Sequence, residues 1–85
     1  PFYKRDAVTI SVHQYHRQPF ETLFGVAEAI FRRYGGRPHW GKLHSLKFAE
    51  LERLYPRWGD YHAVRRRLDP QGKLLNSYLK QMFGA

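Results

Sequence analysis

The stretch QPFETLFGVAEAIFRRYGG, residues 18–36, decides the fold because it combines a helix start, an apolar stripe and a helix stop. Pro19 suits the first turn of a helix, and Glu21 favours the positive end of the helix dipole. Apolar side chains follow at the spacing of a buried helical stripe, at Phe20, Leu23, Phe24, Ala27, Ile30, Phe31 and Tyr34. The pair Gly35-Gly36 ends the pattern, with one glycine expected in the left-handed conformation. The stretch therefore predicts one long helix packed on a neighbouring element.

The segment before this helix, AVTISVHQYH at residues 7–16, alternates apolar and polar side chains as a strand does. Val8 and Ile10 fall on one face, and His13 and Tyr15 fall on the other. The second face is typical of a strand that lines a cavity, although the solvent-facing side of a sheet reads almost the same. One or two strands cannot satisfy their own backbone hydrogen bonds, so we expect this segment to complete a larger sheet.

The segment after the helix, RPHWGKLH at residues 37–44, concentrates reactive and aromatic side chains where a regular backbone is not expected. Pro38 biases Arg37 towards an extended conformation, and Gly41 allows a turn or the close approach of a flat ligand. We interpret residues 37–44 as a site loop. The alternative is a plain connection in which Trp40 packs into the core and the charged groups lie in water.

Three shorter helices are expected after the loop, each with its own start signal. Ser45 can cap a helix at residues 46–55, which Pro56 ends, and Asp60 can cap a helix at residues 61–68. A turn is expected at residues 69–72, and Asn76 can cap a terminal helix. The predicted fold class is therefore α+β, with one or two strands and about four helices.

The composition is that of one small basic domain. The 85 residues include 15 Lys+Arg and 7 Asp+Glu, which gives a formal charge of +8, and 42% of them are hydrophobic. A positive chain attracts any polyanion, including nucleic acid, an acidic membrane surface or a cofactor phosphate, and the charge alone does not choose among these. The absence of cysteine excludes disulfides, thiolate metal sites and cysteine nucleophiles. No apolar run in the sequence is long enough to span a membrane.

A metal-binding site and a nucleic-acid-binding module are the two other functions that these residue types allow. Five histidines invite a metal site, but His39 and His44 have no carboxylate nearby and His13 and His16 fall on opposite faces of a strand, so we predict no bound metal. His16, His44 and His62 are interpreted as structural or exposed. A nucleic-acid-binding module would use the basic and aromatic residues, yet neither a helix-turn-helix nor an RNA-recognition pattern is present. That module and a purely structural assembly fragment stay as alternatives.

Four groups of residues, in this order and spacing, resemble the C-terminal part of the D-arabinono-1,4-lactone oxidase family. They are RPHWGK at 37–42, LYPRW at 54–58, RRLDP at 66–70 and LN at 75–76, the last followed by an aromatic helix. The family groups sugar-lactone and alditol oxidases with the vanillyl-alcohol-oxidase type of FAD fold. The resemblance runs from about Ser11 to Phe83. Ser77 departs from the proline that many members carry, which leaves the start of the last helix open.

The resemblance implies an FAD-dependent oxidoreductase that oxidises a hydroxyl-bearing carbon of a sugar lactone or alditol by hydride transfer to flavin. Residues 1–44 would be the end of its substrate domain, including the site loop, and residues 45–85 a helical C-terminal tail. FAD would be bound mainly by a domain missing from this chain, so the isolated chain is expected to be inactive.

The partners implied are the remainder of the same oxidase, with its FAD-binding and substrate domains, and a small sugar lactone or alditol. No nucleic acid is expected, while weak membrane association and self-association of the isolated chain are left open. The chain begins at Pro1 without an initiator methionine or a signal-peptide pattern, so we expect a piece of a longer protein that is cytoplasmic or peripheral to a membrane and not secreted.

The resemblance also implies roles for individual residues. Lys42 matches the family's active-site lysine in the His-Trp-Gly-Lys motif, and its ammonium can stabilise an anion on the reduced flavin or the substrate oxygen. His39 is the second expected catalytic residue, through a hydrogen bond or proton transfer, with a structural bond that holds the loop as the alternative. The remaining expectations are substrate binding by His13 and Tyr15 and cofactor binding by Trp40 and Asn76.

Overall fold

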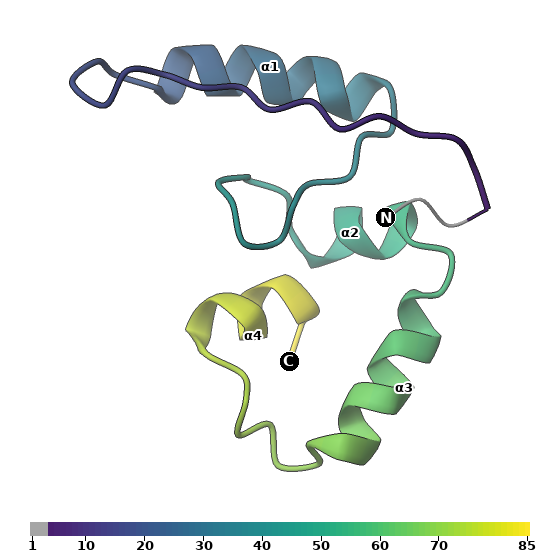
Figure 1. The fold of residues 1–85 in the computed structure, drawn as a ribbon. Coiled ribbons are helices and arrows are strands. Elements are labelled where there is room, and N and C mark those ends of the chain that lie inside the picture. The colour runs from purple at the N-terminus through teal and green to yellow at the C-terminus, as the bar shows by residue number, and fades with distance from the viewer. Residues whose placement is uncertain (1–3) are drawn as a thin grey trace. The chain divides into compact units, whose positions relative to one another are not determined.

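Figure 1 shows the chain as a computed structural model, which describes residues 4–85. These residues contain four helices and neither a strand nor a sheet. The chain divides into two compact units, an N-terminal unit that ends at Arg37 and a C-terminal unit from Pro38 to Ala85. The α+β class predicted from the sequence is therefore wrong, and the described chain is helical.

The error lies in residues 7–16, which form no strand. In Figure 1 this segment is part of the purple trace that precedes α1 and carries no arrow. The side chains of Val8 and Ile10 are 82% and 66% exposed, so the apolar face of the expected strand is not buried within the described chain. Alternation tells which side chains share a face, whereas a strand also needs a second segment to take its N–H and C=O groups. No segment among residues 4–85 supplies that pairing.

Helix α1, Glu21–Arg33, confirms the long helix of the N-terminal unit. Its end is set by the two glycines: Gly35 has a φ of +67°, and a Cβ added to Gly36 would lie 2.9 Å from the carbonyl oxygen of Phe31. The apolar stripe is only partly covered, since none of the helix residues is buried and Ile30 is 53% exposed. An ion pair of 3.1 Å between Arg32 and Glu28 lies on the helix surface.

The C-terminal unit contains α2, Phe48–Leu54, α3, Trp58–Leu68, and α4, Ser77–Phe83. Helices α2 and α4 pack against each other. The buried core consists of Leu46, Leu51, Trp58, Met82 and Phe83. Partly buried side chains that pack on it include Trp40, Tyr55 and Leu79. One small aromatic core thus holds three short helices and the segment that carries Trp40.

Two helix starts differ from the prediction. Helix α2 begins at Phe48 and not at Leu46, with Lys47 at its N-cap, where the Glu50 carboxylate accepts the N–H of Lys47 at 3.0 Å. Helix α3 begins at Trp58, and Asp60 lies in its first turn, 2.7 Å from the Arg57 guanidinium. Both acidic residues lie at the positive end of a helix dipole, which favours them there.

The turn predicted at residues 69–72 and the helix cap predicted at Asn76 are both confirmed. Asp69 accepts the backbone N–H groups of Lys73 and Leu74 at 2.8 and 2.9 Å, which forms the turn, and Gly72 within it has a φ of +65°. These N–H groups, that of Leu74 first, lower the pKa of the Asp69 carboxyl. Asn76 caps α4 by accepting the N–H of Leu79 at 2.8 Å, so serine at position 77 is compatible with the expected helix start.

Candidate functional site

The reactive side chains of the site loop lie on one tight turn. The N–H of Lys42 donates to the carbonyl oxygen of His39 at 3.0 Å, which closes the turn over residues 39–42. The N–H of Gly41 donates to Nδ1 of His39, also at 3.0 Å. A Cβ on Gly41 would lie 3.2 Å from the His39 ring, so glycine lets the ring lie against the turn. His39 and Lys42 are both exposed.

The tautomer of His39 follows from this geometry. Because Nδ1 accepts a hydrogen bond from a backbone N–H, it cannot carry a proton in the neutral ring. The neutral ring therefore carries its proton on Nε2, the nitrogen farther from the backbone. This bond also holds the turn, so the structural role that the sequence left open for His39 is present, and Nε2–H is available as a donor.

Trp40 anchors the turn in the C-terminal unit. Its indole makes edge-to-face contacts with the rings of Tyr55, Trp58, Tyr61 and Phe83, at centroid distances of 5.4–5.9 Å. Its Nε1–H donates to the hydroxyl of Tyr55 at 3.0 Å. The indole is thus a packed part of the core, as the alternative interpretation of the loop required, and its proposed place beside a cofactor stays a prediction.

The backbone of the loop is held by Tyr78 on α4. The Tyr78 hydroxyl donates to the carbonyl oxygen of Trp40 at 2.7 Å, and Nε2 of His44 lies 2.7 Å from the same hydroxyl. Since the single phenol proton goes to the carbonyl, His44 must be the donor in the second bond. Burial raises the pKa of the Tyr78 phenol further above neutral pH. His44 is therefore structural, in agreement with the sequence interpretation.

The structure brings some of the expected site residues together. His39, Trp40 and Lys42 share one turn, with Trp40 pointing into the core and the other two exposed. Asn76 lies in the same C-terminal unit, but its side-chain oxygen is occupied by the helix cap. His13 and Tyr15 belong to the N-terminal unit, where both are exposed.

Sequence reasoning missed the two tyrosines that fix the loop, Tyr55 and Tyr78. Neither was singled out from the sequence, where both fall within the expected helical segments. Their hydroxyl groups could have indicated this role, because a buried tyrosine hydroxyl needs a hydrogen-bond partner, whereas phenylalanine has no such group. In this unit those partners are the Trp40 indole and the Trp40 carbonyl.

The exposed side-chain donors of Lys42 and His39 could together contact one polar edge of a flavin. Lys42 offers an exposed ammonium and His39 one N–H, while the polar atoms of Trp40 and the amide oxygen of Asn76 are engaged within the protein. Among residues 4–85, no three His, Asp or Glu side chains gather as a metal ion would need. None of the four described helices combines the length and the apolar character required to cross a membrane.

Comparison with known proteins gives a consistent set of relatives. The D-arabinono-1,4-lactone oxidase family matches residues 1–82. An L-gulono-1,4-lactone dehydrogenase from Mycobacterium tuberculosis is 46% identical over 82 residues, which cover 96% of this chain and 19% of the relative. An L-gulonolactone oxidase from Scyliorhinus torazame is 38% identical over 87 residues, covering 98% of this chain and 20% of that protein. An alditol oxidase from a Streptomyces species is 34% identical, covering 96% and 20%.

No solved structure matches the chain. The chain spans about a fifth of the length of these curated relatives.

Proposed function

Because the chain belongs to the D-arabinono-1,4-lactone oxidase family, we propose that it is the C-terminal part of an FAD-dependent enzyme that oxidises the hydroxyl-bearing carbon of a sugar lactone or alditol. The names of the relatives, which are lactone dehydrogenases, lactone oxidases and an alditol oxidase, support this substrate class. The observation that carries the proposal is the turn at residues 39–42, where an exposed lysine stands on a backbone that the core and Tyr78 hold in place.

FAD supplies, when bound, the acceptor of the hydride that leaves the substrate carbon. In the proposal, the Lys42 ammonium would lie beside the polar edge of the flavin, which becomes negative as the hydride arrives, or beside the substrate oxygen, which becomes negative as it loses its proton. A fixed positive charge at that position stabilises the transition state more than the ground state. His39 donates its Nε2–H to the same ligands and helps to orient them.

The contacts that Trp40 and Tyr78 make behind the turn hold the Lys42 backbone in a fixed position. Electrostatic stabilisation requires that the charged group be in place before the reaction, because a group that must be reoriented loses part of its effect. Trp40 fixes the turn through its indole in the aromatic core, and Tyr78 fixes it through the Trp40 carbonyl. The His-Trp-Gly-Lys motif is therefore interpreted as a catalytic lysine together with the residues that position it.

The test uses the complete enzyme that contains this sequence. We expect the purified protein to carry FAD and its absorbance to bleach under anaerobic conditions when L-gulono-1,4-lactone, D-arabinono-1,4-lactone or a five-carbon alditol is added. A protein that carries no flavin, or a bound flavin that none of the three compounds reduces, would contradict the proposal. Gluconate, which has no lactone ring and carries a charge, is the control compound.

A further inference from the structure

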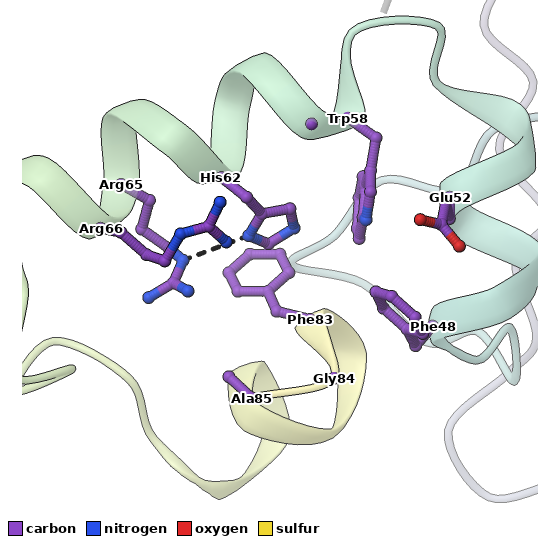
Figure 2. Close-up of a pocket in the computed structure, with 10 residues that line it drawn as sticks. Phe48, Glu52, Trp58, His62, Arg65, Arg66, Phe83, Gly84 and Ala85 are labelled. Atoms are coloured by element: carbon purple, nitrogen blue, oxygen red, sulfur yellow. Dashed lines mark hydrogen bonds between the residues drawn. The ribbon is translucent and has the colours of Figure 1, made fainter.

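Among residues 4–85, the buried core lies entirely in the C-terminal unit. Figure 2 shows part of it, where the rings of Phe48 and Phe83 lie 6.1 and 5.9 Å from that of Trp58, between α2, α3 and α4. Helix α1 of the N-terminal unit, by contrast, has no buried residue. Its apolar side chains therefore lack the cover that the core side chains of the other helices have.

Four exposed apolar side chains form a continuous row on α1, which we call the outer stripe. They are Leu23, Val26 and Ile30 within the helix and Tyr34 at its C-cap, and they are between 40% and 78% exposed. Steps of three and four residues keep successive side chains on one face of a helix. Single exposed apolar side chains are normal on a protein surface, whereas a contiguous row of them marks an interaction site.

The N-terminal unit covers a different part of the same helix. Phe24, Ala27 and Phe31 are half-buried and form a second row beside the outer stripe. Helix α1 is therefore apolar over a wider face than its own unit covers. A helix with two adjacent apolar rows packs against more than one neighbour, and the described chain covers only one of the two rows.

The charged residues of α1 restrict the kind of partner. The helix has two acidic side chains, Glu21 and Glu28, and two basic ones, Arg32 and Arg33, and Arg32 pairs with Glu28 at 3.1 Å. A helix that lies on a membrane surface has a polar face rich in Lys and Arg, and a nucleic-acid contact also needs a positive excess. Helix α1 has no such excess, so the outer stripe fits an apolar protein surface.

The size of the outer stripe distinguishes a second copy of this chain from a segment of the same polypeptide. Stable interfaces between separate proteins bury about 800 Å² on each partner, which is more than four partly exposed side chains present. A segment of the same polypeptide needs less area, because the connecting chain already keeps the two surfaces near each other. This chain covers 19% to 20% of its relatives, so most of a polypeptide in this family lies outside it.

We propose that the outer stripe of α1 is an internal docking surface, which packs against an apolar surface of the same enzyme outside these 85 residues. Val26 and Ile30 form the centre of the contact, and Leu23 and Tyr34 form its two ends. The proposal depends on the length of the relatives and not on the proposed oxidation, so its test requires neither flavin nor lactone.

The test measures how fast a thiol reagent labels single cysteines on α1, since the chain contains no cysteine of its own. Val26→Cys places a thiol in the outer stripe with little change in volume. Gly25→Cys is the matched control, because it lies one residue away on another side of the helix, where an added Cβ meets nothing within 4 Å. Both variants are made in the 85-residue chain and in the complete enzyme, with any other cysteines of the enzyme replaced by serine and its thermal unfolding checked.

In the complete enzyme we expect Val26→Cys to be labelled at least about tenfold more slowly than Gly25→Cys, because a covered thiol reacts only after local opening. In the 85-residue chain the two rates should agree within about threefold, since both thiols are exposed there. Rates within threefold of each other in the complete enzyme would overturn the proposal. Slow labelling of Val26→Cys in the 85-residue chain would also overturn it, because the outer stripe would then be covered by this chain itself or, if the rate falls with protein concentration, by a second copy.

Discussion

The hydroxyl of Tyr78 is the single group whose removal tests how the site loop is held. In Tyr78→Phe the ring and its packing remain, while the 2.7 Å bond to the Trp40 carbonyl and the 2.7 Å bond from His44 are both lost. A typical hydrogen bond contributes about 0.5–1.5 kcal/mol net, so two bonds contribute about 1–3 kcal/mol. Tyr78 is 43% exposed, and water can replace part of each bond, which lowers the expected loss to about 1–2 kcal/mol.

The assay is urea denaturation of the 85-residue chain, followed by tryptophan fluorescence. Tyr61→Phe is the matched control, because Tyr61 lies in the same aromatic cluster and is 42% exposed. The control should change the free energy of unfolding by less than about 0.5 kcal/mol. If Tyr78→Phe and Tyr61→Phe lower stability equally, or if neither lowers it, the loop is not held by this hydroxyl and the argument for a fixed turn fails.

Three other perturbations address the cofactor, the core histidine and the last helix. The isolated 85-residue chain should not bind FAD, because its loop supplies only two exposed groups to a flavin; saturable fluorescence quenching at micromolar FAD would contradict this. The lowered pKa of folded His62 means that the unfolded chain binds more protons below the unfolded value of about 6.5, so stability should fall as pH drops through that value. His62→Gln should flatten this slope in urea titrations at several pH values, and an unchanged slope would refute the assignment. Asn76→Ala should cost about 0.5–2 kcal/mol through loss of the cap while Asn76→Asp keeps it, and equal stability of the two variants in thermal unfolding would show that the cap is not needed.

Local signals in the sequence predicted most of the helices. Gly35 ends α1 because it takes a positive φ, and Gly36 because it lies close to the Phe31 carbonyl. Both requirements concern the local backbone, so glycine in the sequence predicts them. Asn76 and Asp69 are equally local, since each bonds to N–H groups three to five residues ahead. Helix starts at Phe48 and Trp58 were misplaced because Leu46 was needed in the core and Trp58 could begin a helix without a side-chain cap.

The failures concern contacts between distant residues. The alternation in residues 7–16 was real, but whether a segment pairs as a strand depends on a partner that the alternation does not encode. The bond between Tyr78 and the Trp40 carbonyl spans 38 residues, and periodicity along the chain does not encode a contact over that separation. For the candidate site, the sequence pointed to the loop at residues 37–44 and to Lys42, whose role stays a prediction, while the contacts that fix the turn came from the structure.

The rate of flavin reduction in the Lys42→Met variant of the complete enzyme is the most direct test of the proposed role of the loop. Anaerobic stopped-flow mixing with the lactone or alditol substrate measures this rate, and Lys47→Met, which removes another exposed lysine, is the matched control. We expect reduction to slow by about 100- to 1000-fold, equivalent to about 2.7–4 kcal/mol of transition-state stabilisation, with flavin content and the control variant little changed. A Lys42→Met rate within about threefold of the unmodified enzyme, less than about 1 kcal/mol, would contradict the account and leave Lys42 a surface residue of a structural loop.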